Sequence, residues 1–285
     1  MSPQRILIDA PTLASLLESE GCVAIDCRFD LAHVQAGRQL YEESHIPGAI
    51  FLDLNRDLAG PVHADTGRHP LPDVEQINAT LGSLGIGHSD TLVVYDGGNG
   101  SLAARAWWIL RWLGVESIRL FDGGFAQWVA LDLPLENLKP TRLPVVFNGK
   151  PRNSLVLTTA ELAAERLSNP ARNLVDARDR ERFLGECEPI DSVAGHIPGS
   201  VNAPFSEFVT GEGTWRPLEE RTALLEAVLG RDREADWSVM CGSGVTACHL
   251  AISGLEAGFR EPRLYVGSWS QWIRDSDRPI ATGQA

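Results

Sequence analysis

The chain contains one series of short motifs twice, which limits its architecture to two copies of the same folding unit. Three blocks recur in the same order about 150 residues apart. They are Asp-Cys-Arg at 26–28 and Asp-Ala-Arg at 176–178, His-Ile-Pro-Gly at 45–48 and 196–199, and two blocks ending in Gln-Trp at 121–128 and 265–272. Residues 138–152 carry three prolines and little periodicity, as linkers do. We therefore predict an N-terminal domain over 1–137, a linker over 138–152 and a C-terminal domain over 153–285.

Strand-like and helix-like segments alternate within each copy. In the first copy the strand-like segments are 23–25, 91–95 and 118–121, and the helix-like segments are 73–84, 102–113 and 124–131, with a further helix start at 9–12. Short apolar runs of this kind are typical of strands that are buried on both faces. We expect an α/β fold, in which each copy forms a mainly parallel sheet flanked by helices on both faces.

Composition excludes several classes of partner. The chain has 285 residues and is 44% hydrophobic, which is enough for two domains with cores of their own. A net charge of −13 without a basic patch argues against nucleic acid as a partner. Residues 1–10 lack a basic start followed by an apolar run, and no stretch of about 18 apolar residues occurs, so we expect a soluble, unexported protein with no membrane partner. The five cysteines have neither disulfide nor zinc-finger spacing, which favours a cytoplasmic location.

Cys241 lies between a strand-like segment, 237–240, and a helix-like segment that begins at Ala247. The loop over 241–246, Cys-Gly-Ser-Gly-Val-Thr, is long enough for its backbone N–H groups to surround the sulfur, and the helix N-terminus adds a partial positive charge. Both effects favour the thiolate, so Cys241 is a candidate nucleophile, whereas the alternative is a buried structural cysteine. The loop residues expected to bind substrate are Gly242, Gly244, Val245 and Thr246.

A cysteine phosphatase would carry an arginine six residues after its nucleophile, to hold the phosphate. Ala247 occupies that position here, so the neutral loop suits sulfur better than phosphate. When the two copies are aligned on their strands, Asp96 takes the place of Cys241. The first copy therefore has no nucleophile, and we expect it to form a wall of a single active site.

The duplicated blocks, with a loop cysteine in the second copy alone, resemble the tandem-domain rhodanese-like sulfurtransferases over nearly the whole chain. The loop itself resembles that of the 3-mercaptopyruvate sulfurtransferases, because thiosulfate enzymes place a basic residue directly after the cysteine. Here Gly242 and Ser243 follow Cys241. Physical reasoning agrees, since a departing sulfite is doubly charged and would benefit from cations that this loop lacks.

The resemblance implies that the Cys241 thiolate takes sulfur from 3-mercaptopyruvate, releases pyruvate and passes the persulfide sulfur to an acceptor. It also implies proton transfer by a Ser-His-Asp arrangement, whose matching residues are Ser243, His69 and Asp53. The alternatives are that Ser243 caps the following helix and that Asp53 and His69 are surface loop residues. No metal or organic cofactor is expected.

Arg182 matches one of two arginines that bind the substrate carboxylate in the mercaptopyruvate branch. The second arginine normally follows a Glu-Pro pair, but here Ile190 follows that pair. Arg105 is one candidate substitute, although a packing or surface role fits it as well. Cys187, in a polar loop, is a candidate regulatory thiol.

The sequence leaves three hypotheses open. The first is a 3-mercaptopyruvate sulfurtransferase whose acceptor is a small thiol, a thioredoxin-like protein or cyanide. The second is a thiosulfate:cyanide sulfurtransferase. The third is a rhodanese-like module that binds a partner and has no catalytic activity.

Overall fold

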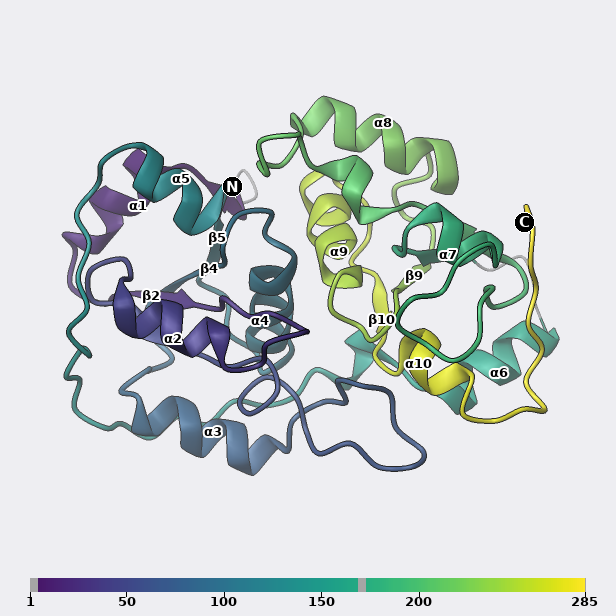
Figure 1. Cartoon of the computed structure of the whole chain (residues 1–285), viewed down its shortest axis with the longest axis horizontal. Helices are drawn as coiled ribbons and strands as arrows, with labels where there is room; N and C mark the ends of the chain where they lie inside the picture. Colours follow the sequence, from purple (N-terminus) through teal and green to yellow (C-terminus); the bar gives the residue numbers. More distant parts are fainter. Residues whose placement is uncertain (1–4, 169–172, 285) are drawn as a thin grey trace. The chain divides into compact units, whose positions relative to one another are not determined.

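The computed structural model describes residues 5–168 and 173–284, and the chain divides into two compact units (Figure 1). The first unit comprises Met1–Gly60, Leu71–Arg152 and Gly211–Trp215, and the second comprises Pro61–Pro70, Asn153–Thr210 and Arg216–Ala285. Residues 1–4 and 285, the outermost parts of the two predicted domains, lie outside the described residues, as do residues 169–172. The segment Pro61–Pro70 thus groups with the second unit although its sequence neighbours belong to the first.

The first unit is built on a five-stranded sheet in the order β1-β5-β4-β2-β3, in which all pairs are parallel. Its strands are β1 (Leu7–Ile8), β2 (Cys22–Asp26), β3 (Ile50–Phe51), β4 (Thr91–Tyr95) and β5 (Ile118–Phe121). Its helices are α1 (Ala10–Leu17), α2 (Ala36–Glu43), α3 (Val74–Ser83), α4 (Ser101–Trp112) and α5 (Gly124–Ala130). The strands and helices predicted for this copy are confirmed, including the start of α1, where the Asp9 carboxylate accepts a hydrogen bond from the Thr12 N–H at 3.0 Å.

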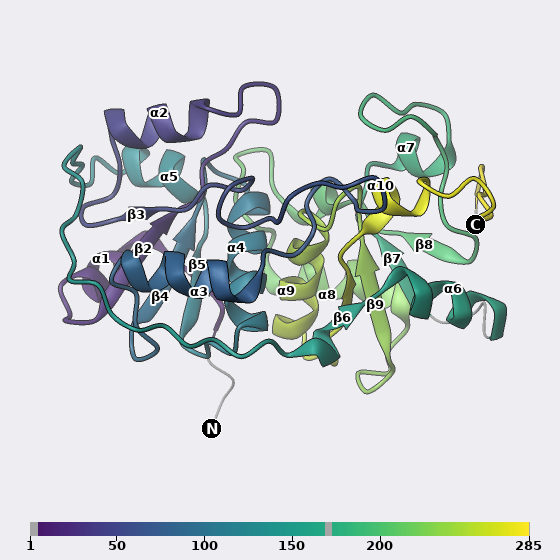
Figure 2. The same ribbon diagram turned by 90° about the horizontal axis from the view of Figure 1, so that it is seen from below.

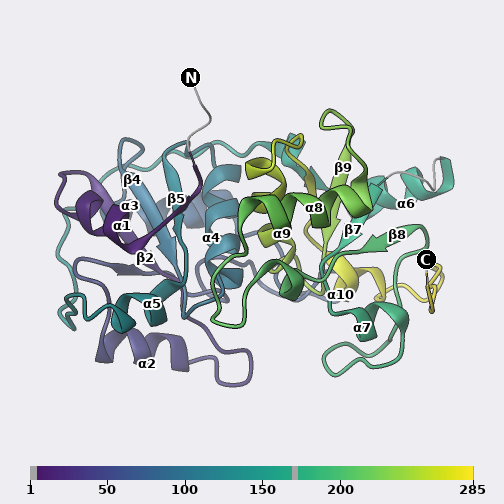
Figure 3. The ribbon, with the colours of Figure 1, turned by 90° about the horizontal axis from the view of Figure 1, so that it is seen from above.

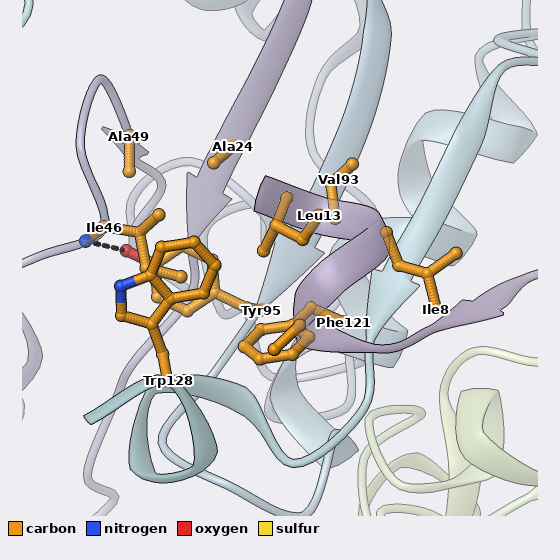
Figure 4. Packing of buried hydrophobic residues seen from close by; sticks show 10 residues of the cluster. Ile8, Leu13, Ala24, Ile46, Ala49, Val93, Tyr95, Phe121 and Trp128 are labelled. Carbon is orange, nitrogen blue, oxygen red and sulfur yellow. Dashed lines mark hydrogen bonds between the residues drawn. The ribbon is translucent and has the colours of Figure 1, made fainter. Parts of the chain in front are cut away.

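Both faces of this sheet are covered, as predicted. Side chains alternate between the faces along each strand. On one face, Leu13 of α1 and Trp128 of α5 pack against strand residues such as Val93 and Phe121 (Figure 4). The residues that alternate with these are also 0–1% exposed: Val23, Ile25, Leu92, Val94 and Leu120. Helix α4 contacts β4 and β5 and buries nine of its residues, so helices shield the sheet on both sides.

The second unit repeats the same topology. Its strand order is β6-β10-β9-β7-β8, and all pairs are parallel. Adding five to each strand number of the first sheet gives this order, so the two sheets have the same topology. The strands are β6 (Val156–Leu157), β7 (Asn173–Asp176), β8 (Ser200–Asn202), β9 (Trp237–Met240) and β10 (Arg263–Tyr265). The helices are α6 (Thr159–Ser168), α7 (Arg180–Leu184), α8 (Leu218–Leu229), α9 (Ala247–Glu256) and α10 (Ser268–Trp272), with two 3₁₀ turns at Asn153–Leu155 and Phe205–Phe208.

Helices cover both faces of the second sheet as well. Met240 and Tyr265 pack with Trp269 and Trp272 of α10 on one face. Helices α8 and α9 pack side by side, and α9 contacts β9 and β10 (Figure 3). The two sheets therefore confirm the predicted duplication of an α/β unit. Among residues 5–168 and 173–284, no helix is long and apolar enough to cross a bilayer.

The duplicated Asp-x-Arg blocks form the same buried ion pair in each unit. Arg28 Nη2 lies 2.7 Å from Asp26 Oδ2, and Arg178 Nη2 lies 2.7 Å from Asp176 Oδ2. In each case the same guanidinium also donates to the carbonyl of the residue before the repeated histidine, Ser44 at 2.6 Å and Gly195 at 2.7 Å. This network recurs in the first unit, where Asp96 replaces the loop cysteine, so its role is structural.

Removing one partner of this pair should destabilise the first unit strongly. Asp26→Ala leaves the Arg28 guanidinium, which is 5% exposed, buried without its carboxylate. We expect a loss of about 3–5 kcal/mol in the free energy of unfolding, measured by urea denaturation. Glu42→Ala is the matched control, because it removes a carboxylate of an exposed pair with Arg38 at 3.9 Å and should change little. Equal midpoints for the two variants would contradict a structural role for Asp26.

Candidate active site

Cys241 directly follows β9, the central strand of the second sheet, and is 2% exposed. In an open parallel sheet, ligands bind beyond the carboxyl ends of the strands. The loop that follows returns the chain to α9, which begins at Ala247. The fold therefore places the predicted nucleophile at the end of the sheet where α/β proteins bind their ligands.

A backbone N–H of the loop bonds to the cysteine sulfur. The N–H of Gly244 donates to Sγ of Cys241 at 3.2 Å, and Gly244 has a φ of +75°, a conformation that side chains disfavour. The other side of the loop is tied to the start of α10, where the N–H groups of Trp269 and Ser270 donate to the carbonyls of Cys241 and Gly242 at 3.0 and 2.9 Å. The carbonyls of Cys241 and Gly242 are thus occupied by α10, while the N–H of Gly244 bonds to the sulfur. Val245 and Thr246 complete the turn, and their carbonyls accept the first hydrogen bonds of α9.

The equivalent loop of the first unit shows how strongly this backbone binds negative charge. Asp96 follows β4, the central strand of its sheet. Its carboxylate accepts four backbone N–H bonds of 2.9–3.1 Å, from Gly98, Gly100, Leu102 and Ala103. The side chain of Asp96 therefore fills the anion-binding loop of its own unit. At the corresponding place in the second unit the chain has sulfur.

The segment 61–70 is attached to α10 by hydrogen bonds. Gln271 Nε2 donates to the carbonyl of Asp65 at 2.8 Å, and Arg274 Nε donates to that of Thr66 at 3.3 Å. The N–H of Arg68 donates to Ser270 Oγ at 3.1 Å. Figure 2 shows this dark-blue segment passing next to α10. These contacts bring two residues of the first half of the sequence, Arg68 and His69, beside the Cys241 loop.

His69 and Ser243 are in direct contact. Nδ1 of His69 lies 2.8 Å from Oγ of Ser243, and the two residues are 5% and 6% exposed. Ser243 is the second residue after Cys241, so the serine of the pair belongs to the same loop as the sulfur. The structure thus joins two of the three residues that the sequence suggested for proton transfer.

Asp53 lies in the first unit, after β3. Its Oδ1 accepts hydrogen bonds from the N–H groups of Asn55 and Arg56 at 2.9 and 3.0 Å, and its own N–H donates to Asp57 Oδ2 at 2.8 Å. Within its unit it stabilises a tight turn. Its participation with His69 stays a prediction.

Arg182, on α7, belongs to a cluster of arginines and carboxylates. Its Nε lies 2.9 and 3.0 Å from the two carboxylate oxygens of Glu188, and its Nη2 lies 3.1 Å from Asp191 Oδ2. Arg68 forms an ion pair with the other oxygen of Asp191. Burial alone would raise the pKa of Glu188, but hydrogen bonds from Arg182 and from the backbone of Asp191 and Ile190 hold it below its usual value. Burial dominates at Asp191 and raises its pKa despite the neighbouring arginines.

The guanidinium groups of Arg68 and Arg182 both lie close to the loop glycine Gly242. A Cβ atom placed on Gly242 would lie 2.8 Å from Nη2 of Arg68 and 3.4 Å from Nη2 of Arg182. The nearby Arg178 also senses the sulfur: burial lowers its pKa, but the charges of Asp176, Glu188 and Cys241 outweigh burial and raise it. Three arginines therefore surround a loop that contains no basic residue of its own.

The structure describes both Ile190, which occupies the position of the missing arginine, and Arg105, the candidate substitute. Ile190 is half exposed, and its N–H donates to Glu188. Arg105 is fully buried in α4 of the first unit, where it donates to the carbonyl of Leu58 at 3.4 Å. Sequence reasoning missed Arg68, although its position directly before His69 was an available signal.

Cys187 is exposed, as its loop position suggested. Within residues 5–168 and 173–284, no three His, Cys, Asp or Glu side chains gather so that they could hold a metal ion.

The sequence matches one protein family twice. The pattern of the rhodanese-like domain matches residues 9–131 and again residues 159–275. A Pseudomonas aeruginosa protein described as a "probable 3-mercaptopyruvate sulfurtransferase" is 46% identical over 97% of this chain and 98% of its own length. A thiosulfate sulfurtransferase from Rattus norvegicus is 36% identical over 95% of this chain and 92% of its own.

A solved structure shows the same relationship. The crystal structure of SseA from Escherichia coli, described as having the rhodanese fold, is 31% identical and superimposes with a TM-score of 0.81. The match covers 94% of this chain and all of the other. Two matched domains, a shared topology and relatives of this identity lead to one conclusion: the chain belongs to the rhodanese-like family and contains two tandem copies of its domain.

Proposed function

We propose that the protein is a 3-mercaptopyruvate sulfurtransferase that carries the transferred sulfur as a persulfide on Cys241. Sulfur transfer is the activity named in the similar proteins from Pseudomonas aeruginosa and Rattus norvegicus. The observation that carries the proposal is the Cys241 sulfur held by a backbone N–H beside the hydrogen-bonded pair Ser243–His69. The site thereby combines a candidate nucleophile, Cys241, with a backbone N–H that stabilises negative charge and a Ser243–His69 pair that can transfer a proton.

The first half of the reaction forms one bond and breaks another. The thiolate of Cys241 attacks the thiol sulfur of 3-mercaptopyruvate, and the bond between that sulfur and carbon 3 breaks with its electron pair remaining on carbon. The carbon fragment is the enolate of pyruvate, and the enzyme retains a persulfide. Backbone N–H groups such as that of Gly244 stabilise negative charge on either the thiolate or the persulfide.

The enolate must receive a proton before pyruvate departs. Ser243 and His69 share a hydrogen bond of 2.8 Å, so a proton lost from the serine hydroxyl is replaced through the imidazole. Asp53 is proposed as the third member on the strength of the sequence resemblance, with the role of orienting His69. Arg182 is proposed to bind the donor carboxylate, for which a guanidinium is suited by its forked geometry.

In the second half, an acceptor thiol or cyanide attacks the outer persulfide sulfur and regenerates the Cys241 thiolate. A small thiol or a thioredoxin-like protein is the acceptor that we propose, in the cytoplasm, where thiols stay reduced. The second candidate function is thiosulfate:cyanide sulfurtransferase. One observation favours it: Arg68 and Arg182 bring positive charge to Gly242, which the sequence of the loop alone did not reveal.

The persulfide can be detected directly. Incubation with 3-mercaptopyruvate should add one sulfur, about 32 Da, to the peptide that contains Cys241, as measured by mass spectrometry. Cys241→Ser should show no addition, whereas Cys187→Ser, which removes an exposed thiol, should react normally. A folded wild-type protein without this adduct would instead support a binding module.

A comparison of donors separates the two catalytic hypotheses. We expect kcat/KM to be higher for 3-mercaptopyruvate than for thiosulfate when both are assayed with the same acceptor. The rates of Cys241→Ser provide the background for each donor. A preference of tenfold or more for thiosulfate would reject the mercaptopyruvate assignment.

Ser243→Ala removes the hydroxyl that contacts His69 and should slow pyruvate release about 100-fold, the usual scale for loss of general acid catalysis. Persulfide-loaded enzyme prepared from another sulfur source should still pass sulfur to the acceptor, because that half needs no enolate proton. Ser206→Ala, an exposed serine in the second unit, is the control. Unchanged turnover would remove Ser243 from the mechanism.

A further inference from the structure

Asp191 and Glu188 are two buried carboxylates of one loop, and both pair with Arg182. Their side chains are 5% and 4% exposed. Besides the Arg182 guanidinium, Glu188 accepts hydrogen bonds from the backbone N–H groups of Ile190 and Asp191 at 3.1 and 3.0 Å. The oxygens of Asp191 are held by guanidinium groups, Oδ1 by Arg68 and Oδ2 by Arg182 at 3.1 Å. The two carboxylates therefore differ in the groups that stabilise their charge.

This difference decides which of the two carboxylates takes up a proton more easily. At Glu188, burial raises the pKa, but the hydrogen bonds from Arg182 and the backbone outweigh burial and keep the pKa below its usual value. At Asp191, burial is the largest effect and raises the pKa. The charges of Arg68, Arg182 and Arg178 oppose this rise, and the charge of Glu188 adds to it. A further negative charge in this cluster would therefore protonate Asp191 before Glu188.

Nη2 of Arg182 faces both Asp191 and the loop that contains the sulfur. It lies 3.1 Å from Oδ2 of Asp191, and a Cβ placed on Gly242 would lie 3.4 Å from it. An anion that pairs with this nitrogen therefore comes close to the Asp191 carboxylate. Two negative charges at such a separation repel each other, most strongly where burial excludes water. Protonation of Asp191 removes this repulsion and leaves the guanidinium to the incoming anion.

We propose that Asp191 is a positioning residue that takes up a proton from solvent when the donor carboxylate pairs with Arg182. The proposal rests on the function proposed above, in which Arg182 binds the donor, and deepens it by making donor binding depend on pH. A carboxyl group whose pKa is higher in the complex than in the free protein takes up a proton on binding. Affinity for an anionic donor therefore rises as pH falls through the interval between these two pKa values.

The pH profile of alkylation at Cys241 tests this coupling without any sulfur donor. Iodoacetate carries a carboxylate and iodoacetamide a neutral amide, and both react with the thiolate. The ratio of their rate constants therefore cancels the titration of Cys241 itself. We expect this ratio, iodoacetate over iodoacetamide, to rise about 10-fold from neutral to mildly acidic buffer in the wild-type protein, because protonated Asp191 no longer repels the reagent carboxylate. Mass spectrometry of the Cys241 peptide gives both rate constants.

Asp191→Asn keeps the shape of the side chain but cannot titrate. Its ratio should be about 10-fold above the wild-type value at neutral pH and should not change with pH. Asp191→Ser, which is smaller, gives the same reading should the asparagine variant fail to fold. The matched control is Glu220→Gln, which removes a carboxylate from an exposed pair with Arg216 in the second unit and should keep the wild-type pH profile.

Two results would overturn the proposal. One is a wild-type ratio that does not change with pH. The other is a pH dependence that persists when Asp191 is replaced, which would assign the titration to another group, such as His69 in the neighbouring segment 61–70.

Donor kinetics separate this proposal from the function on which it rests. KM for 3-mercaptopyruvate should fall with pH in the wild-type protein and stay constant in Asp191→Asn, because only the wild type gains a proton on binding the donor. A KM that falls equally in both proteins would count against Asp191. A wild-type protein inactive with 3-mercaptopyruvate would refute the proposed function, whereas the alkylation ratio would still decide the role of Asp191.

Discussion

Backbone N–H groups of the loop beyond the central strand of each sheet, several in the first unit and that of Gly244 in the second, are the interaction on which the rest of the structure depends. In the first unit they are satisfied by the carboxylate of Asp96, which accepts four of them. In the second unit Gly244 directs its N–H to the sulfur of Cys241, while the loop carbonyls are taken by the start of α10. An unpaired buried donor is costly, so each loop requires a negative or strongly polar group at its centre. The duplication thus produced one loop whose centre is filled by its own Asp96 carboxylate and one whose centre holds the sulfur of Cys241, the proposed nucleophile.

Most of the fold could be predicted because its determinants are local or repeated. The strand at 91–95 and the helix cap at Asp9 follow from short apolar runs and from cap chemistry. The repeated Asp-Arg pairs indicated that one topology occurs twice, and the two strand orders agree. The contact between His69 and Ser243 is different in kind, because 174 residues separate them. No periodicity contains that information, and only the resemblance to a family suggested it.

The association of Arg68 with the second unit could not be predicted from local sequence, for a physical reason. Its segment, 61–70, has no regular secondary structure, and its association with the second unit depends on particular hydrogen bonds to Ser270 and Gln271. It also depends on glycine at 67, where a Cβ would lie 2.5 Å from the carbonyl oxygen of Gly267. A loop of this kind is assigned to one unit or the other by tertiary contacts alone. Position along the chain therefore suggested Arg105 as a substitute for the missing arginine, and Arg105 is buried within the first unit.

The charge of the site is likewise a property of the assembled second unit and not of the loop sequence. Uncharged residues at 242 and 243 suggested a site without cations, yet Arg68, Arg178 and Arg182 all lie close to it. Three carboxylates, Asp176, Glu188 and Asp191, pair with these guanidinium groups. The cluster is thus close to neutral before a donor arrives, and a thiolate at Cys241 makes it negative. A donor with a single carboxylate adds one further negative charge, whereas thiosulfate adds two beside carboxylates that are largely buried. The arginines therefore serve chiefly to orient a singly charged anion. The singly charged donor, 3-mercaptopyruvate, remains favoured over thiosulfate, although the absence of basic residues in the loop is not by itself the reason.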